Sequence, residues 1–523
     1  KTTLSIYGSH DACAVFTNRN GKLKVLEYER FVKKRYAMYS ERYDHRINDI
    51  GTCQEDRHEF IQYIKSQLDV TIGCIVYNEL SNIDLEYLAS QFPNAKFEKL
   101  GHHHAHAASG FYNSGFEDAI IFSVDGGGHV HGVIATTKIF KANDNNISLL
   151  ETPNIDLGNR YSQIGFPISE INPGPDSDRW SLSYAGKVMG LCAYGNVRKE
   201  WLDAMERYYD SNSMPVEALG HFLKLNFSFN ALEGQDSYDL AATSQHVFEQ
   251  KLFKLIDPYV SDNDNFIIVG GCGLNVLFNQ KFKKLTTGLD KQFYVPSNPN
   301  DCGLALGQYL IKHPESKFNV YNGFELLDKS DLDMYIKSRN AKKVTISEIV
   351  DLIKNGKIIG HVEGNSEIGP RALGNRSIIC DPSIADMKDI LNAKVKFREW
   401  FRPFAPVCRL EDKDIFFNQA YESEFMSYAP LVKNKYKSKL KSICHHDGSA
   451  RLQTVSNSQH KTFYKILSEL NNRNEIPVIL NTSFNIKGQP ILTTIKDALY
   501  CLDNTQMDYV IIEGWLFKRK LNE

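Results

Sequence analysis

The chain has 523 residues, 42% of them hydrophobic and 24% charged, a composition typical of a globular protein with about two to four domains. Its 61 Lys and Arg nearly balance its 63 Asp and Glu, for a net charge of −2. Proteins that bind the nucleic-acid backbone usually carry a basic excess, so a nucleic-acid partner is not favoured. No apolar run approaches the ~20 residues that span a bilayer, so we expect no membrane partner either.

The cysteines and the N-terminal segment indicate the cellular compartment of the protein. The ten cysteines are scattered and form no Cys-x-x-Cys pair, which argues against a cysteine-built zinc site and favours free thiols in a reducing environment. The segment from Thr2 to Phe16 is strand-like and lacks the charged, apolar and small-residue blocks of a signal peptide. We therefore expect a cytoplasmic protein.

The first half of the chain alternates strand-like runs with glycine-rich turns. Ala12 to Thr17 and Leu23 to Glu29 flank a turn at Asn20-Gly21 and predict a hairpin. Ala119 to Val124 and Phe266 to Val269 are apolar runs that end at glycines. Strand, turn and helix in alternation predict an α/β fold, in which ligands gather at the carboxyl ends of strands.

The second half shows the same alternation after a more polar stretch at about residues 312–343, where we place a linker or a decorating helix. A helix, a strand, a loop of small and charged residues and a further buried strand are predicted at Ile346–Ile353, Lys357–Val362, Gly364–Arg376 and Pro477–Leu480. These elements predict a second α/β unit.

The segment Gly101-His-His-His-Ala-His106 carries a metal-binding pattern. His102 and His106 are four residues apart, so on a helix they share one face and can chelate one divalent metal. Structural helices also carry histidine pairs at this spacing. A third, oxygen ligand would come from elsewhere, and Asp301, in the loop before Gly303, is a candidate.

Two glycine-rich turns follow predicted strands, Asp125-Gly-Gly-Gly128 and Gly270-Gly-Cys-Gly-Leu-Asn275. Glycines let backbone N–H groups approach phosphate oxygens, and the aspartate can orient a metal. A plain strand-ending turn explains the first pattern equally well. Neither turn fits GxGxxG or GxxxxGK[ST], so a Rossmann or P-loop nucleotide site is not supported.

Cations cluster in three segments of the second half. Gly369-Pro-Arg-Ala-Leu-Gly-Asn-Arg376 places two arginines in a rigid turn, and Lys394-Val-Lys-Phe-Arg398 and Arg402-Pro403 add cations beside aromatic residues. Arginine binds phosphate and carboxylate groups through two parallel hydrogen bonds. A solvated charged face is the common explanation of such runs, but the interleaved proline, glycine and aromatic residues favour an anion site.

Together these blocks resemble the O-carbamoyltransferase family of nodulation and antibiotic-tailoring enzymes (NodU/CmcH type). An ordered series of blocks is far more specific than any one of them. The matching segments are Gly8–Asp11, Glu29–Phe31, His102–Ala108, Asp125–Gly128, Gly186–Leu191, Gly270–Asn275, Asp301–Gly303, Ile368–Pro382, Lys394–Pro406, Arg451–Gln453 and Asn481–Asn485.

The resemblance implies an actin-like ATPase (ASKHA) fold for residues 1–335 and a YrdC-like α/β domain for residues 336–523. Members of the family make carbamoyl adenylate from carbamoyl phosphate and ATP. They then pass the carbamoyl group to a hydroxyl of the acceptor, here a small molecule, sugar or nucleoside. Mg²⁺ is an expected cofactor and ATP the expected co-substrate, and the oligomeric state is left open.

The resemblance also assigns residues by motif. His102, His106 and Asp301 would hold a divalent metal, Fe²⁺ in characterised relatives, and His10 beside Asp11 would be the general base on the acceptor hydroxyl. A histidine suits that role because its usual pKa is near neutrality. The residues implied around the nucleotide are Asp125, Gly127, Lys187, Gly271 and Asn275. Those implied around carbamoyl phosphate and the adenylate are Arg371, Lys396, Arg398, Arg402, Ser483 and Asn485.

Two positions depart from the family pattern: His129 and Ala185 stand where glutamates are usual, so the acceptor is not inherited from known members. Two alternatives are weighed. A tRNA threonylcarbamoyl transferase-like enzyme fits the near-neutral charge poorly, and a non-catalytic actin-like nucleotide-binding module does not explain the metal-binding residues. A [NiFe]-hydrogenase maturation enzyme would carry cysteine zinc fingers, which this sequence lacks.

Overall fold

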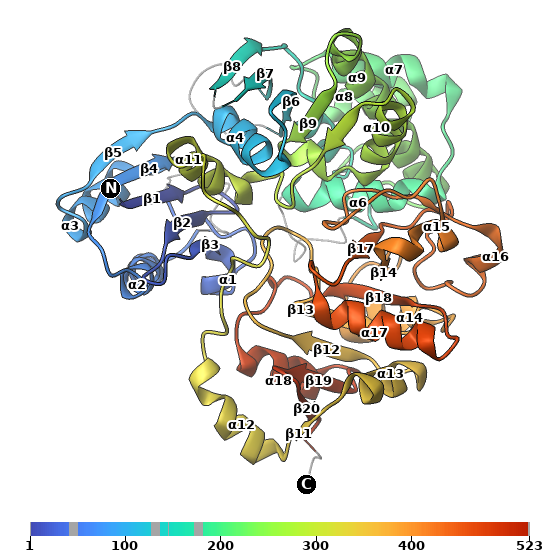
Figure 1. Cartoon of the computed structure of the whole chain (residues 1–523). Coiled ribbons are helices and arrows are strands. Elements are labelled where there is room, and N and C mark those ends of the chain that lie inside the picture. Colours follow the sequence, from blue (N-terminus) through green and yellow to red (C-terminus); the bar gives the residue numbers. More distant parts are fainter. Residues whose placement is uncertain (1, 41–50, 127–135, 145, 172–180, 521–523) are drawn as a thin grey trace.

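The computed structural model describes residues 2–40, 51–126, 136–144, 146–171 and 181–520. The N-terminal half contains two five-stranded sheets, and the C-terminal half is built on one sheet of eight strands (Figure 1). Helices cover these sheets, so the predicted α/β class is confirmed.

The first sheet contains the predicted N-terminal hairpin. Its strand order is β3-β2-β1-β4-β5, with β1, β2 and β3 antiparallel and β4 and β5 parallel to β1. The strands are β1 (Thr2–Tyr7), β2 (Cys13–Thr17), β3 (Leu23–Glu27), β4 (Ile72–Asn78) and β5 (Lys96–Lys99).

The second sheet repeats this topology. Its order is β8-β7-β6-β9-β10, again with three antiparallel strands followed by two that are parallel to the first. The strands are β6 (Asp118–Val124), β7 (Thr137–Asn143), β8 (Asn146–Glu151), β9 (Asn265–Val269) and β10 (Gln292–Tyr294). Two sheets of one topology make up the actin-like ATPase fold expected for this half.

Helices α4 (His102–Ser114) and α11 (Leu304–Lys312) pack against each other between the two sheets. Helix α11 contacts β1 and β2, and α4 contacts β6 and β9. The helices approach closely because Gly307 has no side chain: a Cβ there would lie 1.8 Å from the carbonyl oxygen of Ala105. This packing brings the start of α4 and the turn before α11 to one place.

The other helices of this half flank the first sheet or form a layer beside the second. They are α1 (Tyr28–Val32), α2 (Gln54–Ser66), α3 (Asn82–Gln91), α5 (Leu157–Gln163), α6 (Tyr184–Leu191), α7 (Leu202–Asp210), α8 (Val216–Leu223), α9 (Gln235–Val260) and α10 (Val276–Gly288).

The C-terminal sheet has the order β11-β20-β19-β12-β13-β18-β14-β17. Its strands are β11 (Lys342–Lys343), β12 (Ile359–Val362), β13 (Arg376–Cys380), β14 (Ala405–Arg409), β17 (Gln453–Val455), β18 (Val478–Ser483), β19 (Tyr509–Ile512) and β20 (Trp515–Lys518). A two-stranded sheet joins β15 (Phe417–Asn418) to β16 (Leu431–Val432). The strands predicted at 357–362 and 477–480 are thus confirmed as β12 and β18, and the YrdC-like assignment in particular stays a prediction.

Helices cover both faces of the C-terminal sheet. Helices α13 and α17 share one apolar core with it, and α14 and α18 share the other. The helices of this half are α12 (Leu332–Arg339), α13 (Ile346–Lys354), α14 (Met387–Ile390), α15 (Lys413–Phe416), α16 (Asn434–Lys437), α17 (Lys461–Asn472) and α18 (Ile495–Asn504).

Helix α12 is the decorating helix predicted between the two halves. Its side chains Leu332, Tyr335 and Ile336 pack against the core of the C-terminal half, so the domain boundary proposed at residue 335 falls within a helix. Within the described ranges, no helix is both long and apolar enough to cross a membrane.

Candidate active site

Four metal-ligating side chains converge where the two N-terminal sheets meet. His102 and His106 project from one face of the first turns of α4, Asp125 follows β6, and Asp301 opens the turn before α11. One ligand atom from each residue lies within 4.8 Å of the others. The predicted set of two histidines and Asp301 is thus brought together, and Asp125, assigned from the sequence to the nucleotide, lies in the same cluster.

The atoms of this cluster face one another. His102 Nε2 lies 2.9 Å from Asp125 Oδ2, and His106 Nε2 lies 3.2 Å from Asp301 Oδ1. His106 Nε2 and Asp301 Oδ1 are buried, and neither forms a hydrogen bond within the described part of the chain. Two imidazole nitrogens with two carboxylate oxygens are a donor set that suits Fe²⁺, Mn²⁺ or Zn²⁺. The residues present therefore fit a divalent metal.

The electrostatics of the cluster favour positive charge. Burial alone would lower the pKa of His106, but the nearby carboxylates of Asp125 and Asp301 raise it to about 9. Burial alone would raise the pKa of Asp125, but the hydrogen bond with His102 and the nearby ring of His106 hold it well below its usual range. Two carboxylates thus remain charged in a buried place, which a bound cation would neutralise.

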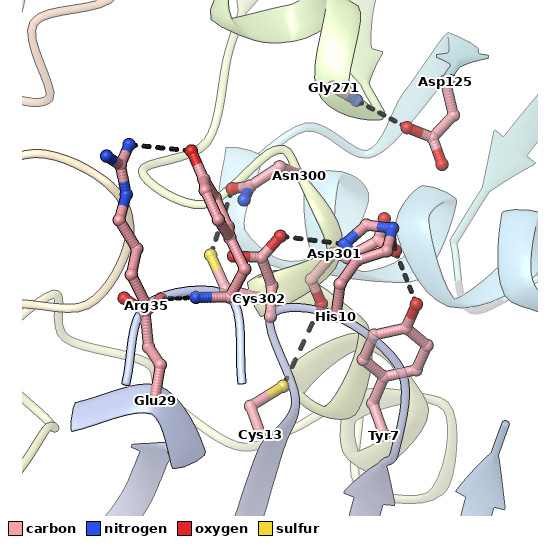
Figure 2. A network of polar contacts seen from close by, with 12 residues as sticks. Tyr7, His10, Cys13, Glu29, Arg35, Asp125, Gly271, Asn300, Asp301 and Cys302 are labelled. Atoms are coloured by element: carbon pink, nitrogen blue, oxygen red, sulfur yellow. Dashed lines mark hydrogen bonds and ion pairs between the residues drawn. The ribbon is translucent and has the colours of Figure 1, made fainter. Parts of the chain in front are cut away.

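Neighbouring groups orient these ligands. Tyr7 Oη donates to Asp301 Oδ2 at 2.5 Å, and the backbone N–H of Gly271 donates to Asp125 Oδ1 at 3.0 Å (Figure 2). Each carboxylate therefore keeps one oxygen on the protein and turns the other toward the histidines. Such outer contacts fix the direction and basicity of metal ligands.

His10 lies beside this cluster at the edge of a cavity. Its Nδ1 is 3.0 Å from Asp11 Oδ2, and its Nε2 is 3.5 Å from Asp301 Oδ2. Asp11 has a positive φ of 58°, a backbone conformation that non-glycine residues rarely adopt. Burial alone would lower the pKa of His10, but Asp301 and Asp11 raise it to about 9. The ring is placed to exchange a proton with a molecule in the cavity.

The residues assigned to the nucleotide have different surroundings. Gly127 lies outside the described residues, and Gly271 and Asn275 line the cavity after β9. The Asn275 side chain is engaged within the protein: its Oδ1 accepts from the Phe278 N–H, and its Nδ2 donates to Gln245 Oε1. A ligand could therefore contact the polar atoms of this side chain only in exchange for these bonds.

Lys187 is engaged across the interface between the two halves. Its Nζ lies 2.9 Å from Glu399 Oε1 and donates to the carbonyl oxygen of Ile171 at 3.2 Å. The lysine lines the same cavity as the turn after β9, but its charge is already paired with that of Glu399. Its role in this structure is to join the two halves.

The cations predicted in the second half gather at one wall. Lys396 Nζ donates to the carbonyl oxygens of Ser483 and Asn485, at 2.6 and 2.7 Å, and to their side chains. Lys396 follows directly on a π-helical turn over residues 391–395, an irregularity common at functional sites. The predicted residues Lys396, Ser483 and Asn485 therefore form one hydrogen-bonded group.

This wall carries more positive than negative charge, although Glu399 Oε2 lies 3.4 Å from Arg402 Nη1. Burial and the nearby charge of Arg402 lower the pKa of Arg371 to about 10. Burial, Arg398 and Arg402 hold the pKa of Lys396 well below its usual range. Arg451 is affected likewise, and its Nε is buried with no hydrogen-bond partner in the described ranges. Such a wall is suited to a polyanion.

Both halves line one cavity of about 410 Å³. The N-terminal wall presents the acidic and metal-ligating side chains, and the C-terminal wall presents the cations. The lining includes His10, Asp11, Asp125, Lys187, Gly271, Asn275, Asp301, Arg371, Lys396, Arg398, Arg402, Arg451, Ser483 and Asn485. Thirteen of the sixteen site residues expected from the sequence thus border one space. His102 and His106 are not among the lining residues, and Gly127 lies outside the described residues.

Two family models match the chain. The one described as Carbamoyltransferase N-terminus matches residues 28–310, and the one described as Carbamoyltransferase C-terminus matches residues 350–519. The chain belongs to the carbamoyltransferase family. The recognition made from the ordered motifs is confirmed, and so is the expectation of an enzyme.

Curated relatives agree with this assignment. The nodulation protein NolO of Bradyrhizobium diazoefficiens is 29% identical over 80% of this chain and 79% of its own. The 3'-hydroxymethylcephem-O-carbamoyltransferase of Amycolatopsis lactamdurans is 30% identical over 68% of this chain and 69% of its own. Among solved structures, HypF aligns at a TM-score of 0.36 and 12% identity over 60% of this chain and 55% of that chain, too weak a likeness to carry an argument.

Among the cavity-lining cations of this carbamoyltransferase that the sequence left unassigned are Arg35 and Arg451. Arg451 belongs to a family block, Arg451-Leu-Gln453, that was matched without a role. Arg35 lies over the ring of Tyr36 and donates to its hydroxyl at 2.7 Å. Both arginines border the cavity. The signal for Arg451 was its motif, whereas no local pattern marks Arg35.

Proposed function

We propose that this enzyme is an ATP-dependent O-carbamoyltransferase that works in two steps. In the first, carbamoyl phosphate, ATP and water give carbamoyl adenylate, phosphate and pyrophosphate. In the second, a hydroxyl of the acceptor attacks the carbamoyl carbon, the bond to AMP breaks, and the hydroxyl proton leaves. The products are the carbamate ester and AMP.

The observation that carries this proposal is the single cavity between a metal-type cluster and a wall with an excess of cations. Phosphate-rich substrates need the cations, and a hydroxyl nucleophile needs a base and a polarising charge. A two-step route with an adenylate intermediate needs both walls within reach of one molecule.

The C-terminal wall supports the adenylate step. Arg371, Arg398 and Arg402 offer guanidinium groups to phosphate oxygens, and a bound phosphate would reduce the repulsion among them. Lys396 is held by carbonyl oxygens of residues 483 and 485, so its ammonium group has a fixed position. Stabilising charge that develops on phosphate is the main task of such a site.

The N-terminal wall supports the transfer step. His10 is oriented by Asp11 through Nδ1, and its Nε2, which lies 3.5 Å from Asp301 Oδ2, is the nitrogen that would take the proton of the acceptor hydroxyl. His102, His106, Asp125 and Asp301 would hold a divalent metal, with Fe²⁺ as the expected ion. When bound, the metal would polarise the carbonyl oxygen and neutralise phosphate charge.

The experiment is pyrophosphate release by the purified protein given ATP, Mg²⁺ and carbamoyl phosphate, under reducing conditions with iron supplied. Release should require carbamoyl phosphate and be lost in Lys396→Ala and Ser483→Ala. Lys394→Ala is the matched control because Lys394 is exposed and two residues away. Acceptors would then be screened by the mass gain of one carbamoyl group. No release from the wild type would contradict the adenylate route.

A further inference from the structure

A loop of the C-terminal half, residues 366–371, lies inside the N-terminal half and brings Arg371 to the cavity. Ile368 is fully buried in a cluster that includes Tyr7 and Leu304. The N–H of Ile368 donates to the carbonyl oxygen of Val320 at 2.8 Å. The loop is therefore built into the N-terminal half by both its apolar side chain and its backbone.

Arg30 of α1 donates hydrogen bonds to this loop from one side. Its Nη1 donates to the carbonyl oxygen of Glu367 at 2.5 Å, and its Nη2 donates to that of Gly369 at 2.8 Å. The same Nη2 lies 2.7 Å from Glu27 Oε2, and only 1% of the Arg30 side chain is exposed. A guanidinium can bridge two carbonyls in fixed directions, whereas a lysine ammonium has no such fork.

The other side of the loop rests on the backbone that leads to Asp301. Gly369 has a φ of 99°, and a Cβ there would lie 2.5 Å from the carbonyl oxygen of Ser297. Beyond Arg371, the loop is tied back by Glu367, whose Oε1 accepts from the N–H of Leu373 at 2.6 Å. The backbone is thus fixed on both sides of Arg371.

We propose that Arg30 is a positioning residue for the anion site. From the N-terminal half it fixes the carbonyl groups of Glu367 and Gly369, and so sets the direction in which Arg371 enters the cavity. Two of its contacts are to the loop and one is to Glu27. Its effect on a bound anion therefore passes through Arg371. The inference rests on the proposed function in one respect, the assignment of Arg371 to anion binding.

The test measures the affinity of the full chain for inorganic phosphate by calorimetry. Arg30→Lys keeps a positive charge beside the buried Glu27 and removes the fork, which protects folding. We expect it to weaken phosphate binding about tenfold, the scale of one charge-assisted contact. Arg371→Met should lose a similar amount. The double variant should bind phosphate no more weakly than Arg371→Met alone, because both changes remove the same contribution to binding.

Lys33→Met is the matched control. Lys33 also lies at α1 and joins the two halves, through Asp497 at 2.9 Å, but it does not touch the loop. It should bind phosphate as the wild type does. Hydrogen exchange of the amides of residues 366–373 adds a readout independent of ligand: it should rise in Arg30→Lys and stay unchanged in Lys33→Met.

Three outcomes would overturn the proposal. Wild-type affinity in Arg30→Lys would show that the fork is not needed. A double variant whose phosphate affinity falls by the product of the two single-variant fold-changes would show that Arg30 acts independently of Arg371. Absence of phosphate binding in the wild type would overturn the anion site as well. If phosphate binds and the effects of Arg30 and Arg371 are coupled, but no pyrophosphate is released, the adenylate route would be contradicted. The positioning role of Arg30 would remain supported.

Discussion

Lys187 and Glu399 form a buried ion pair that joins the two halves of the enzyme. Lys187 Nζ lies 2.9 Å from Glu399 Oε1, with the side chains 6% and 8% exposed. The other carboxylate oxygen of Glu399 lies 3.4 Å from Arg402 Nη1. One carboxylate therefore orients a cation on each side of the interface, and the geometry of the cationic wall depends on α6 of the N-terminal half.

Glu399→Gln should lower stability in a pH-dependent way. Burial alone would raise the pKa of Glu399, but Arg402 and Lys187 lower it to about 2. Because the folded pKa lies below the usual 4.5, the carboxylate stabilises the folded protein above that pH. This contribution is lost as the pH falls from 4.5 toward 2. We expect a loss of up to about 3 kcal/mol near neutral pH.

The measurement is the thermal midpoint of Glu399→Gln and the wild type over a series of pH values. The two midpoints should differ most above pH 4.5 and approach each other below it. Glu411→Gln is the control, because Glu411 is 49% exposed and its removal should change stability by less than about 0.5 kcal/mol. A difference that stays constant down to the lowest pH would argue against the ion pair.

His102→Ala should weaken the binding of Fe²⁺ or Mn²⁺ by about a hundredfold or more, because it removes one of four clustered ligands. Calorimetry gives the affinity, and a chelator should lower the thermal midpoint of the metal-loaded wild type far more than that of the variant. His104→Ala is the matched control on the same helix, since the His104 ring stacks on Phe140 instead. Equal metal affinity in His102→Ala would remove this histidine from the ligand set.

The histidine pair could be predicted from the sequence because its geometry is local. Residues four apart share a helix face, so His102 and His106 needed only α4 to form. Asp301 was found by its motif, and the structure brings it within 3.2 Å of His106 Nε2. Asp125 was assigned to the nucleotide by the family resemblance, although the turn alone also suited a metal, because a strand-ending aspartate carries no sign of which neighbour it will face. Its place beside the histidines depends on how α4 packs on β6.

The cationic wall could likewise be predicted only in part from the sequence. Lys396, Ser483 and Asn485 were expected at one site, and Lys396 donates to both of the other residues. The pairing of Lys187 with Glu399 depends on how α6 meets the other half, so no spacing in the sequence could indicate it. Asn275 was expected to face a ligand, but its side chain caps α10 and pairs with Gln245, a role that asparagine often takes at helix starts.

His10→Asn should separate the two proposed steps. The adenylate step depends on the C-terminal wall, so pyrophosphate release in the first turnover should persist. Release of AMP should slow about 10²- to 10⁴-fold, the usual contribution of a general base. The ratio of AMP to pyrophosphate, followed by chromatography, reports this directly. Asp11→Asn should have a smaller effect of about tenfold, because Asp11 only orients His10. Equal loss of both products in His10→Asn would place the histidine in the first step instead.

Arg451→Met should bind phosphate more weakly and yet be more stable in phosphate-free buffer. Burial and the charges of Arg371, Arg398 and Arg402 hold the pKa of Arg451 well below its usual range, so its charge is disfavoured where it lies. Replacing the guanidinium with an apolar side chain relieves that repulsion and removes an unpaired buried group. Phosphate supplies the counter-charge and should raise the thermal midpoint of the wild type more than that of the variant. Arg473→Met is the control, since Arg473 already pairs with Asp351 and Glu469. A variant less stable than the wild type in phosphate-free buffer would show that Arg451 supports the fold rather than an anion.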